Sequence, residues 1–154
     1  MNAIAALIIA LLIPLLIGGL GSLTMKNNVK TWYTTLQKPS LNPPSVVFGP
    51  VWTTLYVAMG LASWLVWKKT GLMSYALAVY ATQLLLNGLW SPVFFALKSP
   101  QAAFGIIVAL LVVIVENVSA FWHVSQAAGI LMLPLLAWTG FATYLNSEIV
   151  RLNY

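Results

Sequence analysis

The chain has 154 residues, of which 61% are hydrophobic and only 6% are charged, with a formal net charge of +5. An average soluble domain is about one quarter charged, so this composition excludes a soluble enzyme, a disordered chain and a nucleic-acid binder. The absence of cysteine and the single histidine also exclude disulfides, thiol nucleophiles and an ordinary metal centre held by the protein. What remains is a small all-α integral membrane protein.

Residues 3–23 form the first apolar segment, which is predicted to be a membrane-spanning helix because about 20 apolar residues suffice to cross a bilayer. The alternative is a secretory signal peptide, since small residues follow the apolar run at 18–22. However, no Lys or Arg precedes the run and no Ala-x-Ala cleavage site follows it. These absences favour a helix that is retained in the mature protein.

The next segment, 24–46, is predicted to be a long loop. Pro39, Pro43 and Pro44 forbid a continuous helix through it, because proline lacks a backbone N–H and restricts the residue before it. A connection of this length in such a small protein more often has a function than serves only to join two helices. We therefore expect the loop to take part in function.

Four further spans are predicted after the loop, where charge is nearly absent. They lie at 47–67, 73–96, 102–122 and 129–149, and the segment 123–129 supplies the turn between the last two. Helix is the required state because the bilayer core offers no water to the backbone. The sequence thus predicts one domain over residues 1–154, a five-transmembrane-helix bundle with its termini on opposite faces.

The loop charges predict the orientation of this bundle. Two lysines, Lys68 and Lys69, lie on one face, and five cations lie on the C-terminal face: Lys26, Lys30, Lys38, Lys98 and Arg151. Cytoplasmic loops carry the excess of Lys and Arg. The C-terminus is therefore expected to be cytoplasmic.

Polar and aromatic residues recur at helical spacing on three spans, and the three stripes converge in the half of the bundle nearest the long loop. They are Trp52, Tyr56 and Met59, then Gln83, Asn87, Trp90 and Phe94, and finally Trp138, Phe141, Ala142 and Leu145. An amide inside the membrane is costly unless it is paired or faces a cavity. We therefore predict an aromatic-walled ligand cavity beneath the loop, with the amides of Asn87 and Gln83 as orienting groups. The alternative is tight helix packing through the same residues.

Glu116 is the one charge predicted to lie well inside a span. We interpret it as forming an ion pair with Lys68 or Lys69, and the alternative is a proton relay with His123. The histidine lies in the wrong half of the membrane to ligate a haem iron in the predicted cavity. Three tryptophans at helix ends on this same side are interpreted as an aromatic belt: Trp64, Trp67 and Trp122.

Four motifs in chain order resemble the translocator protein family, whose members are also called tryptophan-rich sensory proteins or peripheral benzodiazepine receptors. The motifs read Trp32-Tyr33-x-x-Leu36-x-Lys38-Pro39-x-x-x-Pro43-Pro44, Gly49-x-x-Trp52-x-x-Leu55-Tyr56-x-x-Met59-Gly60, Gln83-Leu84-x-x-Asn87-x-x-Trp90-Ser91-x-x-Phe94-Phe95 and Leu133-Pro134-x-x-x-Trp138-x-x-Phe141-Ala142-x-x-Leu145-Asn146. The resemblance covers nearly the whole chain, and the order of the motifs makes it specific.

The resemblance implies a five-helix bundle, usually a homodimer, in a bacterial or outer mitochondrial membrane. It implies binding of hydrophobic planar molecules: porphyrins, sterols in animal members, and benzodiazepine-type compounds. No cofactor is obligatory, although porphyrin or haem is expected as a ligand. Matching motif positions, together with the stripe on the second span, assign the ligand role to Tyr33, Pro43, Trp52, Tyr56, Asn87, Trp90, Phe94, Trp138 and Ala142. Light-dependent porphyrin breakdown, which the family's pocket tryptophans have been linked to, would map to Trp52 and Trp138.

One motif of the animal members is incomplete. Their cholesterol motif requires a tyrosine a few residues before Lys or Arg at the end of the last span, but here Tyr144 lies too far upstream of Arg151. This departure favours a microbial or plant-type member and weakens the expectation of sterol recognition through that motif.

The leading functional hypothesis is a membrane receptor that binds tetrapyrroles for sensing, transport or disposal. The alternatives are a light-dependent porphyrin-degrading enzyme, a transporter of the same ligands, and a purely structural bundle. Catalysis by side chains is not expected, because no nucleophile–base pair can be assembled. The expected partners are a planar apolar molecule, membrane lipid and a second copy of the chain.

Overall fold

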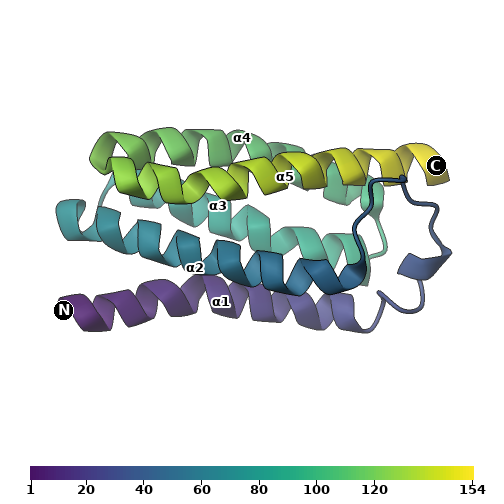
Figure 1. Cartoon of the computed structure of the whole chain (residues 1–154), viewed down its shortest axis with the longest axis horizontal. Helices are drawn as coiled ribbons and strands as arrows, with labels where there is room; N and C mark the ends of the chain where they lie inside the picture. The colour runs from purple at the N-terminus through teal and green to yellow at the C-terminus, as the bar shows by residue number, and fades with distance from the viewer.

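The computed structural model describes residues 1–154, and every regular element in it is helical. Five long helices run along a common direction: α1 (Ala3–Lys26), α2 (Ser45–Thr70), α3 (Tyr75–Ser91), α4 (Pro100–Val124) and α5 (Gln126–Asn153) (Figure 1). Two short elements accompany them, the 3-10 turn η1 (Tyr33–Thr35) in the long loop and the π-helical turn η2 (Pro92–Ala96) after α3. The two termini lie at opposite ends of the bundle, as predicted (Figure 1).

Four of these helices, α1, α2, α4 and α5, are long and apolar enough to cross a membrane. The prediction of an all-α, multi-pass membrane protein is therefore confirmed. The third predicted span, 73–96, is less regular than expected, because α3 has only 17 residues. Pro92 has no N–H to continue the α-helical ladder, and the chain goes on as a π turn in which Leu97 N–H bonds Pro92 O at 3.0 Å.

The turn between α4 and α5 is much tighter than the predicted segment 123–129. Only Ser125 separates the two helices; it has extended backbone angles, and its hydroxyl accepts a hydrogen bond from Ala128 N–H at 3.3 Å. A Cβ on Gly129 would lie 2.7 Å from the Trp122 ring, so glycine is what permits the close approach. The α4 helix therefore ends two residues after its predicted bound, and α5 begins three residues before its predicted bound.

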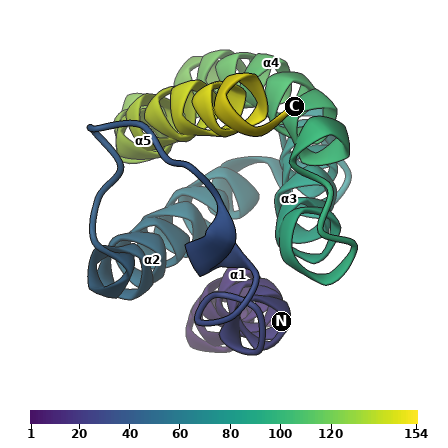
Figure 2. The same cartoon turned by 90° about the vertical axis from the view of Figure 1, so that its right-hand side faces the viewer.

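Viewed along the bundle, the helices follow the order α1, α2, α5, α4, α3 around a central space (Figure 2). The half away from the long loop is filled by an apolar core that includes Met59, Val66, Ile114, Phe121 and Met132, all fully or almost fully buried. The α1 helix packs on α2, α3 and η2, and its outer side chains stay exposed, as expected for a helix that faces lipid.

The long connection, residues 27–44, crosses the end of the bundle from α1 toward α5 and returns to α2 (Figure 2). Two hydrogen bonds tie it to the end of α5: Gln37 N–H donates to Asn153 Oδ1 at 2.9 Å, and Asn153 Nδ2 donates to Gln37 O at 2.8 Å. The loop therefore covers the open end of the central space.

Candidate functional site

A cavity of about 410 Å³ lies between the helices beneath the long loop. Its walls come from all five helices, η2 and the loop, and 17 of its 28 lining residues are hydrophobic. None of them is Asp, Glu, Lys, Arg or His. The volume falls within the range of about 300–1,000 Å³ typical of small-molecule sites.

The structure brings eight of the nine predicted site residues onto the wall of this cavity. They are Tyr33, Trp52, Tyr56, Asn87, Trp90, Phe94, Trp138 and Ala142. The ninth, Pro43, does not line it, and its neighbour Asn42 does. The reason is local, because the Asn42 side chain turns toward Tyr33 and pairs with its hydroxyl.

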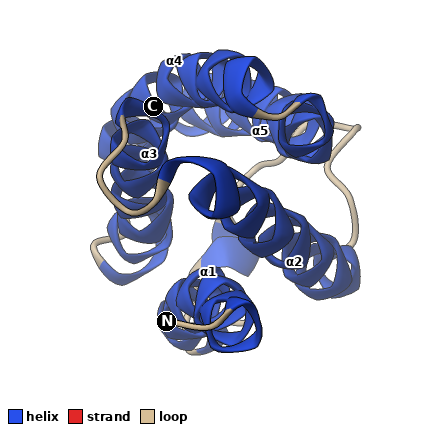
Figure 3. Cartoon of the chain, turned by 90° about the vertical axis from the view of Figure 1, so that its left-hand side faces the viewer, coloured by secondary structure: helices blue, strands red, loops and turns tan.

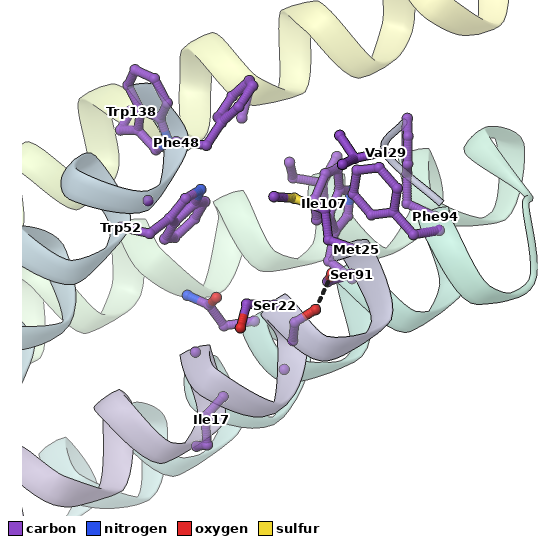
Figure 4. Close-up of a pocket in the computed structure, with 18 of the residues that line it drawn as sticks. Ile17, Ser22, Met25, Val29, Phe48, Trp52, Ser91, Phe94, Ile107 and Trp138 are labelled. Atoms are coloured by element: carbon purple, nitrogen blue, oxygen red, sulfur yellow. Dashed lines mark hydrogen bonds between the residues drawn. The ribbon is translucent and has the colours of Figure 1, made fainter. Parts of the chain in front are cut away.

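Aromatic rings form two opposite walls of the cavity (Figure 4). On one side, Trp52 stacks on Tyr56 with ring centroids 5.6 Å apart, and Phe48 meets the Trp138 ring edge-on at 6.1 Å. On the other side, Phe94 lies 5.0 Å from Trp90. The space between these walls can therefore take a flat ligand with an aromatic surface near each of its faces.

Asn87 supplies the main polar group of the cavity wall. Its Oδ1 accepts a hydrogen bond from Tyr56 Oη at 3.4 Å, and its Nδ2 donates to Gln83 Oε1 at 3.0 Å. Gln83 is fully buried behind Asn87 and does not line the cavity. Of the two predicted orienting amides, only Asn87 therefore faces the cavity, and Gln83 holds the Asn87 amide in place.

Asn146 is a second cavity amide that the sequence interpretation did not assign. It accepts a hydrogen bond from Trp90 Nε1 at 2.9 Å and donates to Pro100 O at 2.9 Å. These two bonds fix the Trp90 indole between α3 and α5. The sequence feature that could have identified it is an asparagine in an otherwise apolar span. Such an amide requires a hydrogen-bond partner inside the protein.

The contribution of α1 was also missed. Gly18, Gly21 and Ser22 line the cavity, and a Cβ on Gly18 would lie 2.2 Å from the Tyr56 ring. Ser91 Oγ donates to Gly21 O at 2.9 Å, which joins α1 to α3. Small residues on α1 therefore allow Tyr56 to lie flat against the wall. The run of small residues at 18–22 was the signal for this close packing.

The loop closes the cavity through Tyr33, which is buried beside Phe94 and Phe95 at centroid distances of 6.2 and 5.7 Å. Its Oη donates to Asn42 Oδ1 at 3.3 Å and accepts from Asn42 Nδ2 at 3.2 Å. Burial raises the pKa of the Tyr33 phenol, and the hydrogen bond to Asn42 lowers it in part. The Lys38 ammonium lies 4.6 Å from the centre of the same ring.

Replacing Tyr33 by phenylalanine tests this closure. The variant keeps the ring but loses the link to Asn42, which should cost about 1 kcal/mol of loop stability. Amide hydrogen exchange across residues 27–44 is expected to accelerate, while exchange in α4 stays unchanged. The matched control is Tyr154→Phe, an exposed tyrosine at the C-terminus. Unchanged exchange in the loop of Tyr33→Phe would show that this pair does not hold the loop.

At the opposite end of the bundle, the predicted ion pair of Glu116 with Lys68 or Lys69 is wrong. Glu116 is exposed and accepts a hydrogen bond from Tyr75 Oη at 3.0 Å. The Lys68 ammonium lies 4.1 Å from the centre of the Trp64 ring, and Lys69 Nζ donates to a backbone carbonyl, Val124 O, at 3.3 Å. The lysines are satisfied elsewhere because they lie at the end of α2, nearer an indole and a helix terminus.

The chain is similar in sequence to known proteins along nearly its whole length. The TspO/MBR family matches residues 10–152. The chain is 43% identical to the Tryptophan-rich protein TspO of Chlorobaculum tepidum over 90% of each chain, and 39% identical to that of Archaeoglobus fulgidus over 97% of this chain and 98% of the other. It is 43% identical to the human Translocator protein over 80% of this chain and 75% of the other. With its aromatic cavity beneath a long loop and this similarity along nearly its whole length, the chain belongs to the TspO/MBR family.

Proposed function

We propose that the protein binds a flat, largely apolar molecule, a porphyrin or a related tetrapyrrole, in the cavity beneath the loop. The observation that carries this proposal is a wall of three tryptophans, Trp52, Trp90 and Trp138, around a space with no charged lining residue. Each favourable aromatic pair adds about 0.5–1.5 kcal/mol beyond the burial of area. The Asn87 amide offers a hydrogen bond to a carbonyl or a ring nitrogen.

The uncharged walls also predict how such a ligand is oriented. A buried carboxylate without a partner is costly, so the propionates of a porphyrin should remain outside the cavity. Lys38 lies beside Tyr33, and its ammonium, which donates to Leu36 O at 3.0 Å, has further N–H groups that make it a candidate partner for them. An exposed pair of this kind contributes only about 0–1 kcal/mol, so the ring system carries most of the affinity.

Family membership supports a sensory or transport role in a membrane, and one relative is named a Tryptophan-rich sensory protein. We propose that all five helices cross the bilayer, with η2 extending the short α3 to the loop face. The five cations of that face support a cytoplasmic C-terminus as part of this proposal. A homodimer is part of the same proposal and is testable by cross-linking in native membranes.

A titration of the purified protein with protoporphyrin IX in detergent tests the proposal. Saturable binding at one site per chain is expected, with a shift of the porphyrin absorption band as the ring leaves water. Adding an isoquinoline ligand should displace the porphyrin, because both would occupy the same aromatic slot. Porphyrin uptake that rises linearly with detergent and never saturates would contradict the proposal.

Photochemical breakdown of the bound porphyrin is a second candidate, favoured by the position of Trp52 and Trp138 on one cavity wall. The pigment itself would absorb the light, so no catalytic side-chain pair is needed. Under illumination, the absorbance of the bound pigment should fall faster in the wild type than in Trp52→Phe at equal occupancy. Equal rates in both proteins, or loss at the rate of free pigment, would leave binding as the function.

A further inference from the structure

A second hollow, of about 370 Å³, lies at the end of the bundle opposite the long loop. It is bordered by Ser74 and Tyr75 at the start of α3 and by Glu116, Ser119 and His123 near the end of α4. Figure 3 faces this end, where the α2–α3 connection and the α4–α5 turn lie. Because Tyr75 is the first residue of α3, the hollow lies close to the end of the bundle.

The hollow contains a carboxylate with no cation beside it. Glu116 Oε1 accepts one hydrogen bond, from Tyr75 Oη, and the protein's one ion pair joins Arg151 and Glu148. The two lysines at this end are bound to an indole ring and to Val124 O. An exposed anion with only a neutral donor remains open to an external cation.

His123 adds a second acceptor to the hollow. Its Nδ1 lies 2.7 Å from Ser119 O, and because a carbonyl only accepts, Nδ1 must carry the proton. In the neutral imidazole this leaves Nε2 as an acceptor. A carboxylate and an imidazole nitrogen in one hollow fit a primary ammonium, which has three donors.

The surface of α4 next to this hollow carries a stripe of small, exposed apolar residues. Gly105, Ala109 and Val112 are exposed and follow the same face as Glu116, at spacings of four, three and four residues. Val112 is 67% exposed, and no atom lies within 4 Å of where a Cβ on Gly105 would be. This stripe leaves room for an extended hydrocarbon chain beside the charged hollow.

We propose that the hollow binds the headgroup of an ethanolamine phospholipid, with one acyl chain along α4. The ammonium contacts Glu116 and His123, and the phosphate lies toward Lys69, whose amine reaches Val124 at the edge of the hollow. A trimethylated headgroup keeps the charge but has no N–H to donate, so the site discriminates between ethanolamine and choline lipids.

Native mass spectrometry of the purified protein with lipids of identical acyl chains tests this assignment. The wild type should retain about threefold to tenfold more phosphatidylethanolamine than phosphatidylcholine, since charge-assisted hydrogen bonds form only with the primary amine. Glu116→Gln should lose this excess, and the matched control Glu148→Gln should keep it. Equal retention of both lipids by the wild type, or an unchanged excess in Glu116→Gln, would overturn the proposal.

Three further measurements test the proposal even if Glu116→Gln does not fold. In the wild type, stepwise N-methylation of the ethanolamine headgroup should lower retention at each step, and a flat series would overturn the proposal. Displacement of the lipid by equimolar O-phosphoethanolamine would assign the hollow to a soluble amine instead. The chain has no cysteine, so Val112→Cys reports contact with a second copy; efficient disulfide cross-linking there would also contradict a lipid-covered stripe.

Discussion

Replacing Trp138 by alanine is expected to weaken porphyrin binding by about tenfold, because one aromatic contact and its apolar area are lost from the cavity wall. The indole meets Phe48 at 6.1 Å and Phe141 at 5.7 Å, so its removal also loosens the ring cluster of that wall. Asn87→Ala should weaken binding less, by about fivefold, since it removes one hydrogen-bonding group worth about 1 kcal/mol. Absorbance titrations of the bound porphyrin measure both effects.

The matched control for Trp138→Ala is Trp67→Ala, which removes an indole at the opposite end of the bundle, outside the cavity. Its porphyrin affinity should equal that of the wild type. The thermal stability of each variant in detergent separates loss of binding from loss of fold. If Trp138→Ala and Asn87→Ala both bound porphyrin as tightly as the wild type, the cavity would not be the binding site.

The parts of the site that follow a helical period could be predicted from the sequence. Trp52 and Tyr56, four residues apart, stack on one wall, and Asn87 and Trp90, three residues apart, line the same cavity. Spacing fixes which side chains share a helix face before any packing is known. The indole and amide content of three spans therefore predicted where the cavity would be.

Where the sequence has no helical pattern of polar residues, it did not predict which residues line the cavity. The loop has no repeating geometry, so the sequence does not reveal that Asn42 rather than Pro43 turns inward. The α1 helix is apolar on all sides and shows no polar stripe, so its place in the cavity wall depends on how closely Gly18 approaches Tyr56. That approach is a property of two packed helices and is not visible in either one alone.

The position of Glu116 illustrates the same limit for charges. Its predicted lysine partners lie at the end of α2, but α4 packs mainly on α3 and α5, which brings Tyr75 within 3.0 Å instead. Sequence distance from the helix end predicts only how far along α4 the carboxylate lies. The neighbour that it meets depends on the order of helices around the bundle, which the loop lengths do not determine.

Gly60→Ala is expected to have the largest effect on the fold, because the added methyl group forces α1 and α2 apart where they touch. A Cβ at position 60 would lie 2.7 Å from Ala10 O and 2.9 Å from Leu11 Cα, and these are backbone atoms that cannot rotate away. Forcing one extra methyl into such a contact typically costs about 1–3 kcal/mol. The α1 helix packs on α2, α3 and η2 at one side of the bundle, so it should shift outward, and the thermal stability in detergent should fall.

Gly140→Ala is the matched control, since no atom lies within 4 Å of its added methyl group. Alanine is favoured over glycine in a helix interior by about 0.5–1 kcal/mol, so this variant should be as stable as the wild type or more so. Porphyrin affinity should fall in Gly60→Ala, because Gly18, Gly21 and Ser22 would move with α1 away from the cavity. An unchanged melting temperature and affinity in Gly60→Ala would mean that the α1–α2 contact tolerates a Cβ, and that α1 does not form a fixed wall of the site.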